Sequence, residues 1–182
     1  ADAVVAAPPY YLPPTQDELA GYTCRLADEL PLPLFLYNMP SLTKVWFDIE
    51  TIGRLASHEN IVGVKDSSGD LDYFARLVTL RNESRPDWSL FVGPEHLLFD
   101  ALQLGGDGGV NGGANVLPEL FVGCYHACVS GDAERANDLR QQIDEFQSIY
   151  AIGENTSRFV QATKCALSLA GICDSRMAAP FE

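Results

Sequence analysis

Residues 60–70 read Asn-Ile-Val-Gly-Val-Lys-Asp-Ser-Ser-Gly-Asp, and this stretch decides the expected fold. Residues 61–64 form a short apolar run, which is typical of a buried strand. Asp70 can cap a helix that follows, because its carboxylate can accept from the free amides of the first turn. The apolar positions of that helix, at helical spacing, are Leu71, Phe74, Leu77 and Val78. The stretch therefore predicts a strand that ends at Lys65 and leads directly into a helix.

The same strand-then-helix pattern recurs along the first 115 residues. Apolar runs begin near residues 3, 34, 61, 90 and 108, and each gap has room for one helix. Thr15-Gln16-Asp17-Glu18 reads as a capping box, and Asp48 as the cap of a later helix. Because parallel strands need a crossover that helices supply, the alternation predicts a parallel α/β sheet. The runs are apolar throughout, so we expect strands that are covered on both faces.

After residue 115 the pattern changes to helices alone. Three helix-like stretches follow, at roughly 116–129, 132–150 and 155–170, with no strand between them. We therefore expect two parts, a βα region over 1–115 and a helical region over 116–182.

Composition excludes several classes of protein. The chain has 182 residues, 47% of them apolar, and 12 basic against 25 acidic residues give a net charge of −13. This charge argues against nucleic acid or an anionic membrane as a partner. Five cysteines without a Cys-x-x-Cys pair favour a reducing, cytoplasmic location over a disulfide framework. The first residues have no basic region before their apolar run, so they do not read as a signal peptide.

Lys65 is the most informative candidate for chemistry, and Tyr37 is the second. Lys65 ends the strand at 61–64, where burial disfavours the ammonium and favours the neutral amine that a Schiff-base nucleophile requires. Tyr37 ends the preceding strand, and neighbouring parallel strands lie about 4.8 Å apart, so both side chains can address one ligand. The alternative for Lys65 is a lysine at a strand end that is paired with a carboxylate, such as the neighbouring Asp66. The alternative for Tyr37 is a core tyrosine with its hydroxyl at the rim.

Two other patterns are weaker. The glycine-rich residues 105–113 lack the Lys-Ser/Thr ending of a phosphate loop, and they read better as a short strand and loop close to a ligand. Cys124-Tyr125-His126-Ala127-Cys128 places His126 away from the helix face that the two cysteines share. Packing is therefore the better interpretation than a metal site.

Four motifs in order resemble one family, that of dihydrodipicolinate synthase and N-acetylneuraminate lyase. They are Pro8-Pro9-Tyr10-Tyr11, Tyr37-Asn38-Met39-Pro40, residues 60–69, and residues 105–115 followed by Pro118. The resemblance covers essentially the whole chain. It implies a (β/α)8 TIM barrel with a C-terminal helical extension, and class I aldolase chemistry on pyruvate or another 2-oxo acid without a metal or organic cofactor.

The resemblance also assigns roles to residues of this chain. Lys65 becomes the imine-forming lysine and Tyr37 the proton relay. The residues that it places around the substrate are Tyr11, Gly93, Glu95, Val110 and Asn111. It further implies a homotetramer.

Two departures from the family pattern shape the expected function. Leu42 stands where the synthases carry an arginine that holds a substrate carboxylate, which favours a lyase or aldolase for sugar-acid or N-acetylneuraminate-like substrates. A dihydrodipicolinate synthase or a hydratase-aldolase is the alternative within the family. The Gly-Thr-Thr-Gly-Glu-like motif of the second strand is absent, so we expect an incomplete barrel, strands four to eight, that is inactive alone. A non-catalytic remnant or scaffold is the alternative of another class.

Overall fold

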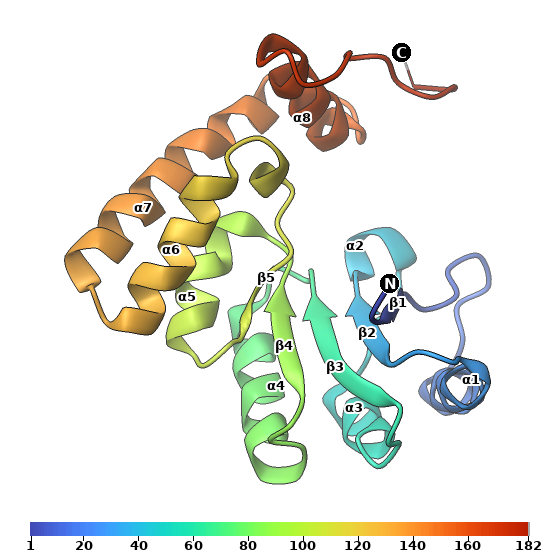
Figure 1. The fold of residues 1–182 in the computed structure, drawn as a ribbon. Coiled ribbons are helices and arrows are strands. Elements are labelled where there is room, and N and C mark those ends of the chain that lie inside the picture. The colour runs from blue at the N-terminus through green and yellow to red at the C-terminus, as the bar shows by residue number, and fades with distance from the viewer. Residues whose placement is uncertain (182) are drawn as a thin grey trace. The chain divides into compact units, whose positions relative to one another are not determined.

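The computed structural model describes residues 1–181, which form two compact units, Ala1–Gly109 and the part from Val110 onward (Figure 1). Each unit has its own buried side chains. The first unit holds the sheet and the second is helical, as Figure 1 shows.

The first unit is a five-stranded parallel sheet whose strands follow chain order. The strands are β1 (Val4–Ala6), β2 (Leu34–Asn38), β3 (Ile61–Asp66), β4 (Ser89–Val92) and β5 (Gly108–Gly109). Its helices are α1 (Gln16–Glu29), α2 (Pro40–Thr43), α3 (Ile49–Leu55), α4 (Leu71–Ser84), the 3-10 turn η1 (Glu95–Leu97) and α5 (Leu98–Gln103). The parallel α/β prediction is confirmed.

Local signals explain where two of the long helices begin. The Thr15 hydroxyl accepts from the Glu18 amide at 3.3 Å, and the Glu18 carboxylate accepts from the Thr15 amide at 2.8 Å. Asp70 accepts from the Tyr73 amide at 3.0 Å. Asp48 stands at the predicted cap position of α3, but its side chain makes no capping bond. The predicted side-chain cap is therefore wrong, and Asp48 is held by its backbone: its amide donates to Gln16 Oε1 at 3.2 Å and its carbonyl oxygen accepts from the Ile52 amide at 2.9 Å.

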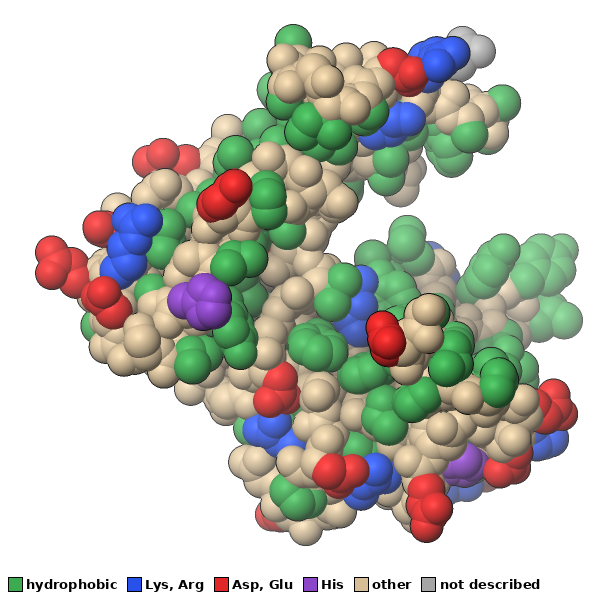
Figure 2. Space-filling model, in the orientation of Figure 1, with side chains coloured by type: hydrophobic (Ala, Val, Ile, Leu, Met, Phe, Trp, Pro, Cys, Tyr) green, Lys and Arg blue, Asp and Glu red, His purple; other side chains and the backbone are tan. Residues whose placement is uncertain are grey.

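The core of this unit lies on one face of the sheet. Leu34, Leu36 and Val64 are buried there, and Figure 1 shows α3 and α4 behind β3 and β4. The opposite face is less covered: burial alternates along β2, Val5 of β1 is 53% exposed, and apolar side chains are visible over the sheet (Figure 2). The expectation of strands covered on both faces is therefore wrong for β1 and β2 in residues 1–181, because the helices of this unit pack on one side.

The second unit is built from helices that pack on each other. Its elements are the 3-10 turn η2 (Gly113–Asn115), α6 (Pro118–Ser130), α7 (Ala133–Phe146), the 3-10 turn η3 (Gln147–Ala151) and α8 (Arg158–Leu169). Phe121, Leu139 and Ile143 form its buried centre. Gly131 ends α6 with a φ of 75°, a left-handed conformation that glycine adopts without strain. No helix within residues 1–181 is long and apolar enough to cross a membrane.

Candidate active site

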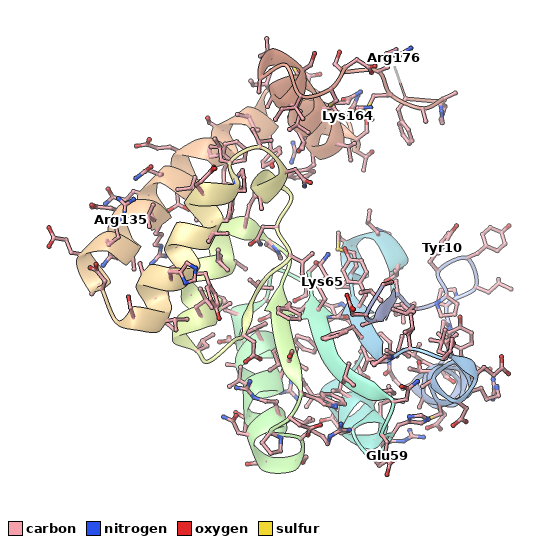
Figure 3. All side chains as sticks on the ribbon, in the orientation of Figure 1. Tyr10, Glu59, Lys65, Arg135, Lys164 and Arg176 are labelled. Atoms are coloured by element: carbon pink, nitrogen blue, oxygen red, sulfur yellow. The ribbon has the colours of Figure 1, made fainter. Side chains whose placement is uncertain are left out.

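Tyr37 and Lys65 meet at the carboxyl ends of two neighbouring strands. The register of β2 and β3 pairs the two residues directly. The Lys65 ammonium nitrogen lies 4.1 Å from the centre of the Tyr37 ring, over its face. Figure 3 labels Lys65 at the end of β3. A cation over a tyrosine ring is attracted by the negative face of the π system. The two residues singled out from their strand ends are therefore in contact.

Small and aromatic residues lie next to this pair on β2, β3 and β4. Phe35 and Phe91 approach each other with ring centres 5.6 Å apart. Gly63 of β3 makes this possible, because a Cβ there would lie 2.5 Å from the Phe35 ring and 2.2 Å from the Ser89 carbonyl oxygen. The Tyr37 and Lys65 side chains are half-buried, so a small molecule can reach them.

Asp66, the carboxylate that follows Lys65 in the sequence, forms hydrogen bonds with residues other than Lys65. Asp66 is buried, and its Oδ1 accepts from Asn38 Nδ2 at 2.8 Å. Its Oδ2 accepts from the Ser68 hydroxyl at 2.9 Å. Burial raises the pKa of the Asp66 carboxyl, against the lowering effect of these hydrogen bonds. The alternative of a Lys65–Asp66 ion pair is therefore wrong, because successive residues of a strand point to opposite faces.

Gly93 and Glu95 follow β4 at the same edge of the sheet. The Gly93 amide donates to the Asp66 carbonyl oxygen at 2.7 Å. A Cβ on Gly93 would lie 1.9 Å from Ser67 Oγ, so the close approach requires glycine. Glu95 is buried at the start of η1. Their assignment to substrate binding stays a prediction.

The three other predicted substrate residues lie in different surroundings. Tyr11 is 88% exposed in the loop between β1 and α1, and Figure 3 shows its neighbour Tyr10 at the outer side of the unit. Val110 and Asn111 belong to the second unit. Val110 is 53% exposed, whereas Asn111 is 9% exposed. Their role beside Lys65 likewise stays a prediction.

The loop after Tyr37 contains a feature that the sequence patterns did not predict. Residues 40–43 form the single turn α2, on which Leu42 is 63% exposed. Lys44 ends this turn with a φ of 60°, and its Nζ donates to the Ser41 carbonyl oxygen at 2.6 Å. A lysine in the left-handed region is uncommon. A proline directly after the cap position was the available signal for the turn.

The cysteines of α6 are explained by packing. Cys124 is buried, and this burial, followed by the neighbouring Cys128 thiol, raises the pKa of its thiol to about 12. The ring of His126 instead lies against Tyr125, with ring centres 5.5 Å apart. Among residues 1–181 there is no group of three histidine, cysteine or carboxylate side chains that could hold a metal ion.

Similar proteins of known sequence include both aldolases and synthases. The chain is 35% identical over 173 residues to the probable 2-dehydro-3-deoxy-D-pentonate aldolase YjhH of Escherichia coli K12, a match over 94% of this chain and 56% of YjhH. It is 40% identical over 144 residues to the 4-hydroxy-tetrahydrodipicolinate synthase of Methanopyrus kandleri, over 79% of this chain and 47% of that protein. The chain thus spans about half the length of the curated relatives it matches.

Solved structures agree with this relationship. Dihydrodipicolinate synthase from Bacteroides thetaiotaomicron matches all of this chain and 61% of its own with a TM-score of 0.94 and 45% identity. YagE of Escherichia coli K12, solved in complex with pyruvate, matches the same shares of the two chains with a TM-score of 0.92 and 27% identity. The family model of the dihydrodipicolinate synthetases matches residues 1–181, and the chain belongs to this family.

Proposed function

We propose that the full-length product of the gene encoding this chain is a Schiff-base-forming lyase or aldolase that acts on pyruvate or a related 2-oxo acid. The observation that carries the proposal is the placement of Lys65 Nζ over the Tyr37 ring at the carboxyl edge of the sheet. Barrel enzymes hold their active sites at this edge. The pyruvate complex of YagE supports a small 2-oxo acid as the ligand class.

Lys65 and Tyr37 together supply the groups that this chemistry needs. The neutral Lys65 amine attacks the 2-oxo carbon, and loss of water from the carbinolamine gives an iminium ion. The 4-hydroxyl loses its proton and its oxygen forms a double bond to C4, so that the bond between C3 and C4 breaks and its electron pair passes to the iminium. The fragment that contains C4 leaves as an aldehyde. The resulting enamine is protonated at C3, and hydrolysis of the imine then releases pyruvate and the amine.

The ring face and the hydroxyl of Tyr37 have different roles in the proposed reaction. The ring face that lies against Lys65 Nζ can also attract the iminium cation. In this proposal the Tyr37 phenol moves protons to and from the substrate oxygens. In this proposal Gly93 and the backbone of Val110 flank the pocket, and Glu95 and Asn111 contact the variable part of the substrate. Tyr11 is a further substrate-binding residue of the proposal.

Leu42 favours cleavage of a sugar-acid or N-acetylneuraminate-like substrate over synthesis of dihydrodipicolinate. Its exposed, apolar side chain cannot hold the carboxylate that an arginine holds in the synthases. The similarity to YjhH, a probable pentonate aldolase, supports this choice. Relatives named as synthases make that reaction the alternative.

Residues 1–182 alone are proposed to be inactive. We assign them to strands four to eight of the barrel and its C-terminal extension, because the motif that binds the oxo-acid carboxylate is not in this sequence. The exposed inner-face residue Val5 of the edge strand β1 agrees with an open barrel. The proposal includes a homotetramer in the cytoplasm, and the free thiols of all five cysteines fit a reducing compartment.

The test is a comparison of two reactions on the full-length gene product. We expect pyruvate release from hydroxylated 2-oxo acids such as 2-dehydro-3-deoxy-pentonate, measured with a coupled dehydrogenase, and no release by Lys65→Ala. Efficient condensation of pyruvate with aspartate semialdehyde would instead favour the synthase. Absence of both reactions would favour a non-catalytic barrel.

A further inference from the structure

The buried face behind Lys65 and Tyr37 carries a closed circuit of hydrogen bonds. Asn38 Nδ2 donates to Asp66 Oδ1 at 2.8 Å, which joins β2 to β3. The Phe47 amide donates to Asn38 Oδ1 at 3.2 Å. The Tyr73 hydroxyl of α4 donates to the Phe47 carbonyl oxygen. One half of the circuit therefore runs from Asp66 to α4 by way of β2.

The other half returns from α4 to Asp66 directly. The Tyr73 amide donates to Asp70 Oδ1 at 3.0 Å. The Asp70 amide donates to Ser68 Oγ at 3.1 Å, and this hydroxyl donates to Asp66 Oδ2 at 2.9 Å. Asn38, Phe47, Asp66 and Tyr73 are buried, whereas Ser68 is half-buried and Asp70 is exposed. We call these six residues the buried circuit, after the four that are buried.

Asp66 is the residue on which the buried circuit depends. It is 2% exposed and Asn38 is fully buried. Burying a carboxylate costs free energy, and apolar residues of similar volume are often as stable or more so. Stability alone therefore does not explain a carboxylate here, whereas the fixed geometry of its hydrogen bonds can.

The circuit acts on the strand ends that hold the reactive pair. The register of β2 and β3 pairs Asn38 with Asp66. The preceding residues of the two strands, Tyr37 and Lys65, are paired in the same way, and their side chains lie on the opposite face of the sheet. The Ser67 amide adds a second bond between these strand ends, to the Asn38 carbonyl oxygen at 2.7 Å. The Gly93 amide, which follows β4, donates to the Asp66 carbonyl oxygen at 2.7 Å and fixes β3 on its other side. A shift of β2 along β3 would break the Asn38–Asp66 and Ser67–Asn38 bonds and would separate Tyr37 from Lys65.

We propose that Asp66, through its hydrogen bond to Asn38, is a positioning residue that holds Lys65 over Tyr37 for imine formation. The inference rests on the proposed function of Lys65. Asp66 itself touches no substrate, because it lies on the buried face.

The test measures how fast the full-length protein traps pyruvate on Lys65 in the presence of borohydride, per folded molecule and at saturating pyruvate. Asp66→Ala should slow this rate on the order of 10-fold to 100-fold, since a misplacement of about 1 Å has effects of this size. The pyruvate concentration at half-saturation should stay the same. Thr23→Ala is the matched control, because it removes another buried hydrogen bond, from Thr23 Oγ1 to the Leu19 carbonyl oxygen at 2.7 Å.

A double variant in which the residues at positions 38 and 66 are exchanged distinguishes a positioning role of Asp66 from an effect on folding or on charge. Asn38→Asp places two buried carboxylates together and should slow trapping. The double variant Asn38→Asp/Asp66→Asn restores the bond between the two strands, with the amide now donating from position 66, and keeps an acceptor for the Ser68 hydroxyl. The Ser68 amide, which donates to Asp66 Oδ1 at 3.2 Å, loses its acceptor in this variant. We therefore expect trapping that is faster than in Asn38→Asp but slower than in the unaltered protein.

Three results would contradict the inference, and they can be told apart. Normal trapping by folded Asp66→Ala would limit Asp66 to a structural role. A double variant as slow as Asn38→Asp would show that the negative charge at position 66 is what matters. An unaltered protein that traps no pyruvate at all would overturn the proposed function itself.

Discussion

The two faces of β2 and β3 differ sharply at their carboxyl ends, although the residues concerned are consecutive. On one face the half-buried Lys65 lies over the Tyr37 ring, with its nitrogen 4.1 Å from the ring centre. On the other face Asn38 and Asp66 are almost completely buried and hydrogen-bonded. The alternation of a strand thus places the Lys65 amine on the less covered face of the sheet and the hydrogen-bonded Asn38–Asp66 pair on the opposite, buried face.

The largest effect is expected from Tyr37→Phe, which alters only the accessible face. The variant keeps the ring under Lys65 but lacks the phenol, so turnover should fall by roughly 10²-fold to 10⁴-fold, the usual range for a positioned proton-transfer group. Stability should change little because the ring packing remains. Steady-state kinetics of the full-length protein measure this. Unchanged turnover would make Tyr37 an ordinary core tyrosine.

Gly63→Ala should disturb the aromatic contact that lies next to the reactive pair. The new methyl group would lie 2.2 Å from the Ser89 carbonyl oxygen and 2.5 Å from the Phe35 ring. Overpacking of this kind typically costs about 1–3 kcal/mol of unfolding free energy. Urea denaturation gives the value, and Gly53→Ala, where the nearest atom would be a flexible Leu80 methyl at 3.4 Å, is the control. Equal effects of the two changes would contradict the tight contact at Gly63.

Asp66→Asn should change how stability depends on pH. Burial raises the pKa of the Asp66 carboxyl above its ordinary value of 3.8, and the charge of Asp70 adds to this. The folded state therefore binds the proton more tightly than the unfolded state. Its stability falls as pH rises from 3.8 through the raised pKa, and the asparagine variant lacks this fall. Urea midpoints across this range should show a flatter curve for Asp66→Asn, and parallel curves would contradict the buried carboxyl.

Lys44→Gly is expected to have the smallest effect and the opposite sign. The lysine has a φ of 60°, and relief of this conformation is worth about 1 kcal/mol, partly offset by the exposed hydrogen bond to the Ser41 oxygen. Thermal unfolding should show a small increase in Tm. A decrease would mean that the Lys44 side chain matters more to the turn than its backbone strain.

Short sequence patterns predicted the helices and strands well, because helix caps and apolar runs depend on residues that are close together in the sequence. The Thr15 capping box, the Asp70 cap and the apolar runs of the strands depend on residues within one or two turns. The pairing of Tyr37 with Lys65 followed from strand order and family motifs. Partners far apart in the sequence left no such pattern. Asn38 and Asp66 are 28 residues apart, and Tyr73 and Phe47 are 26 apart.

The strand alternation nevertheless contained a usable signal for the buried circuit. A polar residue that directly follows an accessible one at a strand end must face the helices, and there it needs a hydrogen-bond partner. Asn38 and Asp66 both satisfy this condition on neighbouring strands. The uneven covering of the two faces had no signal of this kind, because apolar runs look alike whether one or both faces are packed.

The most direct test of the account is the mapping of a pyruvate adduct on the full-length protein. Treatment with pyruvate and borohydride should leave one stable reduced imine, and peptide mass analysis should place it on Lys65. Lys65→Ala should carry none, while Lys44→Gly should be labelled as the unaltered protein is. A modification of equal yield in Lys65→Ala, or its location on Lys44 or Lys164, would contradict the central claim that Lys65 forms the imine.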